Sequence, residues 1–380
     1  MQGFFVDNAV KYDIIITNVS QEINAMARDI GDIDKNLKIE TDINKPDLCM
    51  HDVRKAPFRL YGFYRPEEAP FKRLPFELAK EVNYQVDVLA GNTSCGRVRF
   101  KTNSEYVAIK AVMPDVTRFS HMPLTGSSGF DLYYDIDGVT TYYGSFVPPF
   151  AMTDGYESVI TFRQGGEKQI TINFPLYNNV TDLYIGLQET ATLTAAEEYK
   201  YEKPILFYGS SITQGGCASR PGNCYPSIIS RRFNTNIHNF GFSSGGCGEE
   251  NILEYMAKLD FSIFVMDYDW NAPTAEHLEN THKRAYNIIR KQKPDAPIIL
   301  VSRPDIRLCV EDDLKRREII HRTYTDATAQ GDKNVYFVDG YSLFGEYGHD
   351  GCTVDGTHPN DLGFWRMAEV IGGVIELLLK

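Results

Sequence analysis

Two segments of this sequence carry side chains whose types and spacing could form a nucleophilic site. Ser210 and Ser211 stand side by side in FYGSSITQGG, directly after an apolar run, and Asp355 precedes His358 by three residues in DGTHPN. An aspartate at that distance on a turn can accept a hydrogen bond from the imidazole Nδ1–H, which leaves Nε2 free to take a proton from a serine hydroxyl. These residue types therefore indicate nucleophilic catalysis at a serine.

Both segments also have a structural interpretation. Serine is a common helix cap, so Ser210 or Ser211 could merely begin a helix, and Asp355 could equally cap its own turn. A helix that begins at the serines would also direct its free N–H groups and its positive end toward the site, where an oxyanion would be stabilised. Taken singly, the serine pair favours capping, and only a partner histidine makes chemistry the better interpretation.

A third polar group that could serve such a site is Asn271, in the segment DYDWNAP. Its amide could donate a hydrogen bond to a developing oxyanion, a contribution of about 3 kcal/mol where such a donor has been removed from other enzymes. Alternatively, Asn271 caps a helix that begins near Pro273.

The segment NFGFSSGG contains a competing nucleophile. Gly241, Ser243 and Gly245 match the GxSxG elbow of α/β-hydrolases, with a strand expected before them and a helix after them. Such an enzyme would have several alternating strands and helices before its elbow, and its acid and histidine on separate loops. Here one strand–helix unit precedes the elbow and the acid shares a turn with the histidine, so we do not expect Ser243 to be the nucleophile.

These segments are expected at one edge of a parallel sheet, because short apolar runs alternate with amphipathic stretches in the second half of the chain. Helices on both faces cover such a sheet, and ligands bind at the carboxyl ends of its strands. The loops after Tyr208, Phe240, Met266 and Val301 should therefore share one rim. The predicted strands are 205–208, 237–240, 261–266, 297–301 and 335–338, and the predicted helices are 225–233, 249–258, 276–291 and 362–379.

The first half of the chain has a different pattern. From about Asp47 to Thr194 the apolar residues alternate one by one, without a helical period, which predicts an antiparallel sandwich of jelly-roll type. Asp137–Gly138 and Gly165–Gly166 supply the positive φ that tight hairpin turns need. The predicted strands are 97–100, 106–113, 130–136, 140–147, 158–162, 169–174 and 182–187. A charged bridge near residues 195–200 divides the chain into domains 1–197 and 203–380.

Composition excludes several classes of partner. The 380 residues are 43% hydrophobic, with a formal net charge of −12 and no basic stripe, so we expect no nucleic-acid partner. No apolar run has transmembrane length and the start lacks the pattern of a leader peptide, so we expect no membrane partner. The composition does not determine an oligomeric state.

The cysteines indicate a reducing setting. The chain has seven, an odd number without a CxxC motif or regular spacing, which favours neither a disulfide framework nor a zinc site. We therefore expect cytoplasmic localisation and small apolar roles for these residues. Cys217, Cys247 and Cys352 each lie a few residues from one of the segments above, but their positions alone do not support a redox role.

The four segments, in this order, resemble the sequence blocks of the SGNH hydrolase superfamily, also called GDSL esterases. Gly209–Thr213 is similar to the Gly-Asp-Ser block with Ser210 in place of Asp, which assigns the nucleophile to Ser211. The second block implies that a backbone N–H at Ser244, where the family has Gly, joins the oxyanion hole, with Gly245 as the fallback. Asn271 matches the third block, although its neighbours differ, and Asp355 with His358 matches the last block without alteration.

The first half also has a resemblance. Gly129–Tyr133 reproduces the G-x-D-L-Y signature of a β-sandwich domain that precedes some bacterial SGNH esterases. The two resemblances imply a jelly-roll-like domain followed by a flavodoxin-like three-layer α/β/α hydrolase domain.

The resemblance implies a serine esterase that needs no metal or cofactor. Related two-domain enzymes are often carbohydrate acetyl esterases, so a short acyl ester of a small molecule or oligosaccharide is the expected substrate. Trp270 and Tyr268 could stack on a sugar, and Arg303 could orient it, although packing roles for Trp270 and Arg303 are at least as well supported. The alternatives are a lipase or thioesterase of the same superfamily, and a carbohydrate-binding protein without activity.

Overall fold

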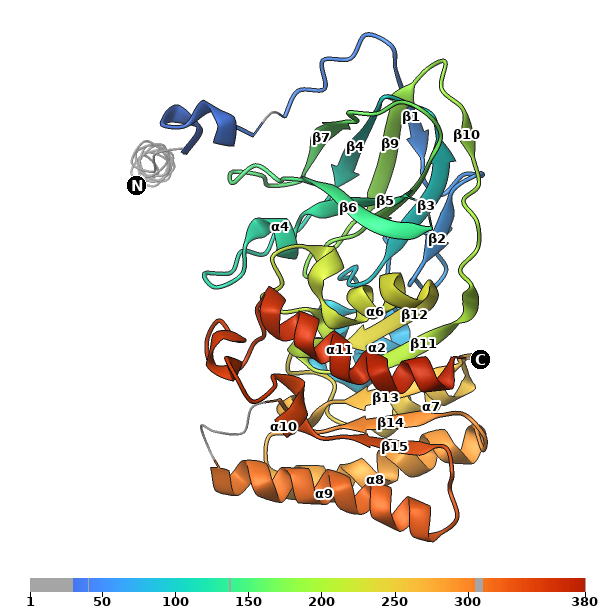
Figure 1. Ribbon diagram of the computed structural model, residues 1–380, viewed down its shortest axis with the longest axis vertical. Coiled ribbons are helices and arrows are strands. Elements are labelled where there is room, and N and C mark those ends of the chain that lie inside the picture. The colour runs from blue at the N-terminus through green and yellow to red at the C-terminus, as the bar shows by residue number, and fades with distance from the viewer. Residues whose placement is uncertain (1–29, 40, 137, 305–309, 380) are drawn as a thin grey trace, which may run out of the picture. The chain divides into compact units, whose positions relative to one another are not determined.

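The computed structural model describes residues 30–39, 41–136, 138–304 and 310–379, and it divides the chain into two compact units, Met1–Glu40 and Thr41–Lys380. The described part of the first unit holds two short 3₁₀ turns, η1 (Ile30–Asp32) and η2 (Lys35–Leu37). The second unit holds both the sandwich and the α/β layers (Figure 1). The boundary that we predicted between 197 and 203 falls inside this unit and stays a prediction.

The first half of the second unit is an antiparallel sandwich. One sheet has the order β1-β9-β4-β7, and the other has the order β10-β3-β8-β5-β6, with β2 added beside β3. The apolar side chains of both sheets meet in one core, which includes Phe100, Ile109 and Ile172. The strands are β1 (Leu48–Asp52), β2 (Arg59–Tyr61), β3 (Arg97–Thr102), β4 (Tyr106–Val112), β5 (Phe130–Ile136), β6 (Val139–Phe146), β7 (Gly155–Thr161), β8 (Lys168–Asn173), β9 (Asp182–Gln188) and β10 (Leu193–Thr194).

This half departs from the sequence prediction in one respect, because it contains helices. They are α2 (Phe76–Val82), α3 (Tyr84–Leu89) and the short α4 (Leu124–Ser127). Leu74, Ala79 and Val86, in and beside α2 and α3, belong to a core that they share with helices of the second half. The expected positive φ occurs at Gly138 (81°) and Gly166 (93°), while Asp137 lies outside the described residues.

The second half is built on a parallel sheet with the strand order β12-β11-β13-β14-β15. Numbered from its own first strand, this order is 2-1-3-4-5, which is the flavodoxin-like arrangement that we predicted. All four neighbouring pairs are parallel. The strands are β11 (Tyr201–Gly209), β12 (Thr235–Gly241), β13 (Ile263–Asp267), β14 (Ile298–Val301) and β15 (Val335–Val338).

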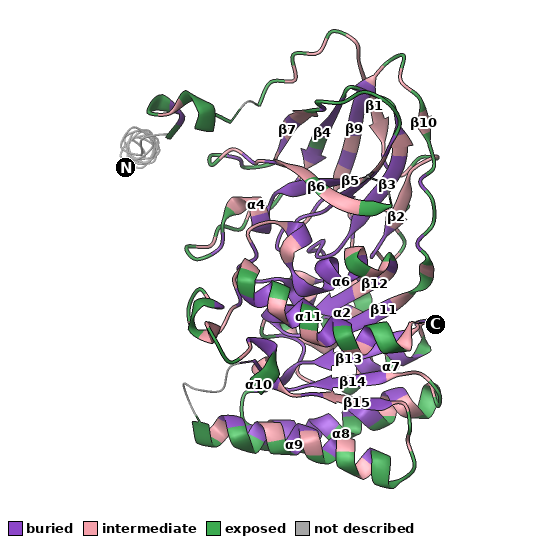
Figure 2. Cartoon of the chain, in the orientation of Figure 1, coloured by how far each residue is buried: buried purple, intermediate pink, exposed green. Residues whose placement is uncertain are grey.

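Helices cover both faces of this sheet. Successive side chains of a strand point to opposite faces, and both sets are apolar here, so each face needs a cover. Leu206 and Tyr208 of β11 pack with α7, α8 and α9, whereas Ile205 and Phe207 pack with α6 and α11. The strands of the sheet are accordingly coloured as mostly buried in Figure 2. The helices are α5 (Ser211–Gln214), α6 (Tyr225–Phe233), α7 (Glu250–Lys258), α8 (Ala275–Gln292), α9 (Val310–Ala329), α10 (Gly340–Leu343) and α11 (Asp361–Leu378), with 3₁₀ turns η3 (Pro221–Asn223), η4 (Asp269–Asn271) and η5 (His349–Gly351).

The carboxyl ends of the strands form the rim that the sequence predicted. Gly209, at the end of β11, is in register with Gly241 of β12 and with Asp267 of β13. The segments that follow these three residues are the ones that carry the candidate site. None of the helices in the described ranges is long and apolar enough to cross a membrane.

Candidate active site

Ser211 is placed by a sharp strand-to-helix turn. A Cβ added to Gly209 would lie 2.1 Å from Thr213 Oγ1 and 2.4 Å from the Asp267 carbonyl oxygen, so the turn has no room for a side chain there. Ser210 caps α5, because its Oγ accepts the Ile212 N–H at 3.2 Å. Ser211 is then the first residue of the helix, and its own N–H has no acceptor within the helix. The two serines therefore separate into one cap and one residue placed for chemistry.

The hydroxyl of Ser211 is hydrogen-bonded to His358. Ser211 Oγ lies 2.9 Å from His358 Nε2, and His358 Nδ1 lies 2.7 Å from Asp355 Oδ2. A carboxylate at Nδ1 favours the tautomer with its proton on Nδ1, which leaves the Nε2 lone pair facing the serine. The three residues thus form one continuous hydrogen-bonded chain.

The carboxylate of Asp355 is held in its ionised form. Partial burial acts to raise its pKa, but hydrogen bonds from the backbone and ring of His358 and from the Thr357 N–H together lower the pKa to about 2. At neutral pH Asp355 therefore carries the charge that orients the imidazole and would stabilise an imidazolium.

The backbone at Ser244 has the conformation of a glycine. Its φ is 57°, in the left-handed region that side chains with a Cβ rarely adopt. This is a conformation that favours Gly, the residue expected there from the resemblance.

The predicted oxyanion donors are engaged with one another. Ser244 N–H donates to Asn271 Oδ1 at 3.1 Å, and Asn271 Nδ2 donates to the carbonyl oxygens of Phe242 (2.8 Å) and Gly246 (3.0 Å). The fallback, Gly245, donates its N–H to Phe242 O at 2.9 Å. In the free protein the predicted loop donors are thus engaged with other protein groups, whereas the Ser211 N–H, as the first of α5, has no acceptor within its own helix.

Ser243 lies in a loop that is hydrogen-bonded to the residues around α5. Its N–H donates to Gln214 Oε1 at 3.0 Å, while Asn239 Nδ2 donates to Thr213 O at 2.6 Å. These bonds join the loop after β12 to the helix that carries Ser211. Within the described ranges it is Ser211, and not Ser243, that pairs with the ring of His358.

The buried carboxylate of Asp267 is hydrogen-bonded to α5, and we did not predict this residue from the sequence. Asp267 Oδ2 accepts from Thr213 Oγ1 at 3.1 Å and from Tyr225 OH at 3.0 Å. Burial raises the pKa of Asp267 to about 7, although the bonds from Tyr225 and Thr213 oppose the shift. Its place at the end of β13, directly before the candidate loop, was the available signal.

The sandwich half also contributes to the site, which the sequence did not indicate. Tyr177, between β8 and β9, donates its hydroxyl to Ser211 O at 3.2 Å. Phe119 packs edge-on against Tyr177, with ring centroids 5.1 Å apart. His121 lies beside it, with its ring centroid 5.8 Å from that of His358 and its Nε2 4.0 Å from Asp355 Oδ2.

Two of the predicted substrate contacts have structural roles. Tyr268 is fully buried, and its hydroxyl lies 2.9 Å from Thr281 Oγ1. Arg303 is buried as well, with Nη1 2.8 Å from Asp313 Oδ1 and Nε 3.4 Å from Asp269 Oδ1. Both side chains are thus buried against protein partners, which favours packing over the substrate contacts that we predicted.

The third predicted contact, Trp270, is half-buried. Its ring stacks on the guanidinium of Arg303, at 4.1 Å from the ring centroid. Its indole nitrogen is buried without a hydrogen-bond partner among the described residues. Trp270 therefore packs on the buried Arg303, and only the exposed part of its side chain is available to a ligand.

A cavity of about 530 Å³ opens beside this site. Residues of helix α3, of the loop that carries Phe119 and of the loop after β12, including Ser243 and Ser244, line this cavity. Its lining mixes aromatic and aliphatic groups with amides and a carboxyl: Tyr84, Gln85, Val88, Leu89, Asn92, Asp115, Thr117, Phe119, Tyr177, Asn179, Ser243 and Ser244.

Comparison with known proteins gives two family matches. Residues 202–376 match the GDSL-like lipase/acylhydrolase family, and residues 49–193 match the GxDLY family, described as the N-terminus of SGNH-hydrolase-type esterases. Together the two matches span most of the chain. Among curated protein sequences, none matches this chain.

Solved structures resemble the chain over most of its length. A protein from Bacteroides ovatus, described as a GDSL-like lipase, is 29% identical with a TM-score of 0.78, covering 87% of this chain and 98% of its own. The salicylyl-acyltransferase SsfX3 is 18% identical with a TM-score of 0.73, over 89% and 100% of the two chains. An acetyl xylan esterase from Butyrivibrio proteoclasticus is 13% identical with a TM-score of 0.56, over 87% and 98%.

The last two likenesses concern the fold alone, whereas the family matches concern the sequence. The family matches cover both halves of the chain. The GxDLY match comes first and the GDSL-like match second, as the signatures GFDLY and GSSIT predicted. By these matches residues 202–376 form a domain of the GDSL-like lipase/acylhydrolase family, and residues 49–193 form a GxDLY domain of the kind found at the N-terminus of SGNH-hydrolase-type esterases.

Proposed function

We propose that this protein is a serine esterase that removes short acyl groups, above all acetyl, from carbohydrates. The observation that carries the proposal is the hydrogen-bonded chain from Ser211 Oγ through His358 to Asp355, at 2.9 and 2.7 Å. It supplies a nucleophile, a base and an orienting carboxylate in one place.

In the proposed reaction His358 Nε2 takes the proton of Ser211 Oγ as the oxygen attacks the ester carbonyl. The tetrahedral oxyanion is held by the Ser211 N–H at the start of α5. His358 then gives the proton to the leaving alcohol, and a water molecule, deprotonated by the same nitrogen, releases the acid from the acyl-enzyme.

Asn271 and Ser244 enter this mechanism only after a rearrangement. The oxyanion must take the Ser244 N–H from Asn271 Oδ1, and an Asn271 N–H from Phe242 O or Gly246 O. Hydrogen bonds of this kind often reach their working geometry only in the complex with substrate. In the free protein the three bonds hold the loop over residues 242–246 in place.

The lining of the cavity supports a carbohydrate as the alcohol part. Sugars are recognised by aromatic faces together with hydrogen-bonding groups, and the cavity offers Tyr84, Phe119 and Tyr177 beside the amides of Gln85 and Asn179. Several solved structures of the same fold are described as carbohydrate esterases, including the acetyl xylan esterase. Their low identity makes them support for the fold only.

The test is a screen of acetylated oligosaccharides with released acetate measured, comparing wild type, Ser211→Ala and the matched control Ser243→Ala. We expect acetate release to fall by roughly 10³-fold or more in Ser211→Ala and to change little in the control. If Ser243→Ala loses acetate release while Ser211→Ala retains it, our assignment of Ser211 as the nucleophile is wrong. Absence of turnover with every ester, 4-nitrophenyl acetate included, would favour a binding protein without activity.

A lipase or thioesterase is the second candidate, and the apolar part of the cavity favours it. Val88, Leu89 and Phe119 could accept a longer acyl chain, and the Bacteroides protein is described as a GDSL-like lipase. Rates on 4-nitrophenyl esters from acetyl to decanoyl separate the two. A maximum at acetyl supports our proposal, whereas a maximum at long chains without acetate release from any sugar contradicts it.

We further propose that the protein acts in the cytoplasm. The sulfurs of Cys95 and Cys224 lie 3.6 Å apart without a disulfide bond between them, as expected in a reducing compartment. Cell fractionation with an esterase assay tests this, and recovery of the activity outside the cells would contradict it.

A further inference from the structure

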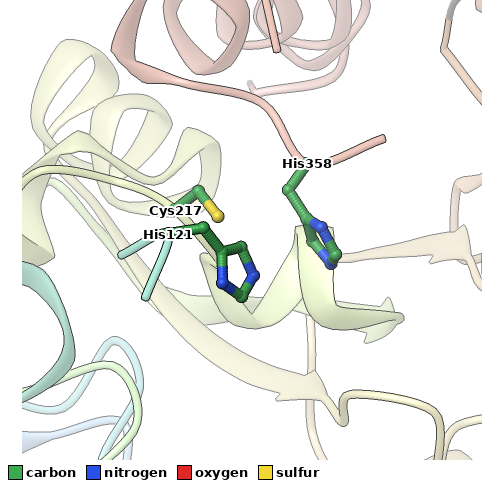
Figure 3. A group of neighbouring side chains, drawn as sticks. All are labelled: His121, Cys217 and His358. Atoms are coloured by element: carbon green, nitrogen blue, oxygen red, sulfur yellow. The ribbon is translucent and has the colours of Figure 1, made fainter. Parts of the chain in front are cut away.

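The ring of His358 takes part in a second cluster that hydrolysis does not require. One nitrogen of His121, the sulfur of Cys217 and one nitrogen of His358 lie within 4.8 Å of one another (Figure 3). The three residues come from separate parts of the chain: the loop between β4 and α4, the segment after α5, and the turn before α11. We propose that they form a binding site for a thiophilic divalent metal ion such as Zn²⁺, and that its binding inhibits the enzyme.

The ligand types and distances suit zinc. Thiolate and imidazole are its preferred protein ligands, at about 2.3 Å and 2.0–2.1 Å, which places ligand atoms around one ion about 3.3–3.6 Å apart. The three atoms must therefore close by about 1.5 Å at most from their present separation. The side chain of His121 is 44% exposed, so its ring can turn toward the other two without disturbing the core. Water would complete the tetrahedron.

Asp355 supports His358 as a ligand. Histidines that bind zinc commonly donate their second ring N–H to a carboxylate, which fixes the tautomer and increases the basicity of the ligating nitrogen. Here His358 Nδ1 is 2.7 Å from Asp355 Oδ2, so Nε2 is the nitrogen offered to a metal. The same atom faces Ser211 Oγ at 2.9 Å. One lone pair cannot serve a metal ion and the serine proton together.

Cys217 is held in an unusual conformation at this place. Its φ is 73°, in the left-handed region, and it is buried, although no step of the proposed hydrolysis uses a thiol. This conformation costs a residue with a Cβ about 1–2 kcal/mol, and strained residues of this kind are often found at functional sites. The strained backbone directs the sulfur toward the two imidazoles.

Binding of the metal exchanges one bond for another without any redox change. The S–H bond of Cys217 breaks, a metal–sulfur bond forms and the proton passes to water, while His358 Nε2 releases its hydrogen bond to Ser211 and coordinates the ion. Removal of the ion by a chelator reverses both steps. The inhibitory consequence rests on the proposed esterase function, but the metal site itself does not.

Metal binding is tested first without any substrate. The chelator-treated full chain is titrated with Co²⁺, which reports thiolate coordination by a charge-transfer band in the near ultraviolet and four-coordinate geometry by strong visible bands. We expect both signals in the wild type and in Ser211→Ala, loss of the thiolate band in Cys217→Ser, and its retention in the matched control Cys49→Ser. No thiolate band in the wild type, or the same band in Cys217→Ser, would overturn the site.

Inhibition is tested separately with Zn²⁺ and 4-nitrophenyl acetate, each variant being compared with its own rate in chelator. The Zn²⁺ concentration for half-inhibition should rise about tenfold or more in Cys217→Ser and in His121→Asn, and excess chelator should restore the wild-type rate. Equal sensitivity of the wild type and both variants would overturn the inhibitory role. If the chain hydrolyses no ester, the Co²⁺ spectra still decide the metal site, so the two proposals can fail independently.

Discussion

The backbone N–H of Ser244 donates to Asn271 Oδ1 at 3.1 Å, and Asn271 in turn donates to two carbonyl oxygens of the same loop. In the free protein the asparagine is thus a brace for residues 242–246. In the proposed reaction it must become a donor to the oxyanion. Both roles draw on the same two hydrogen atoms of the Asn271 amide, which donate to Phe242 O and Gly246 O in the free protein, and a substitution can test both roles.

The first prediction concerns Asn271→Asp, which keeps the shape of the side chain. A carboxylate can still accept the Ser244 N–H, but it cannot donate to Phe242 O, to Gly246 O or to an oxyanion. We expect kcat for 4-nitrophenyl acetate to fall by about 10²–10³-fold with a smaller change in KM. Asn239→Asp is unsuited as a control because Asn239 is fully buried, so Asn236→Asp, at a partly exposed site, is used instead. A full rate in Asn271→Asp would remove Asn271 from the mechanism.

The second prediction concerns the left-handed backbone at Ser244. Replacement by Gly removes a strain of about 1–2 kcal/mol and costs about 0.5–1 kcal/mol of chain entropy, so Ser244→Gly should raise the free energy of unfolding by about 0.5–1 kcal/mol. Ser243→Gly is the matched control, because Ser243 has no positive φ and should lose stability. Urea unfolding of the two variants measures the difference. A decrease in both would show that the Ser244 side chain stabilises the loop.

Much of this architecture could be predicted from local patterns. The strand 335–338 and the helix 225–233 have the predicted bounds, because each shows a clear apolar period between turn residues. Helix α9 was missed, since few of its residues are apolar and only one face packs on the sheet, through Ile319, Ile320 and Ala327. Helices α2 and α3 were missed because they are short and interrupt a series of strands.

The limits at the site have a different cause. Tyr268 could have been assigned to the core, since it continues the alternation of Phe264 and Met266 toward the same face. By contrast, the approach of Tyr177 and His121 to Ser211 depends on how the sandwich packs against the sheet, which no local pattern records. The use of the Asn271 amide as a brace likewise depends on side-chain orientation in three dimensions.

The third prediction is a loss of stability in mild acid. Burial lowers the pKa of His282 to about 3, and burial also lowers that of His238 to about 4, from 6.5. At pH values between these folded pKa values and 6.5, the two histidines bind protons in the unfolded chain but not in the folded chain. These two histidines should therefore lower the free energy of unfolding as the pH falls below about 6.5, by up to about 1.4 kcal/mol per pH unit each, until their folded pKa values are passed. Asp267, whose pKa is raised to about 7, acts in the opposite direction over part of this range and offsets one of the two histidines.

Urea unfolding between about pH 4 and 7 measures this slope. His282→Asn can keep a hydrogen bond to Thr323 Oγ1, which lies 2.9 Å from His282 Nδ1, and it should lower the stability at pH 7 but flatten the slope. An identical slope in His282→Asn and the wild type would show that other groups cause the acid sensitivity.

The last prediction concerns the cavity of about 530 Å³ beside Ser244. Val88 is half-exposed on its wall, so Val88→Trp should fill part of the space without disturbing the core. If the alcohol part of the substrate occupies this cavity, KM for an acetylated oligosaccharide should rise about tenfold or more, while kcat and the rate on 4-nitrophenyl acetate change little, because contacts remote from the reacting carbonyl act mainly on binding. Val139→Trp, at an exposed position at the start of strand β6, is the control. An equal loss on both substrates would mean that the acyl group, rather than the sugar, enters the cavity, and the carbohydrate would then have to bind elsewhere around Ser211.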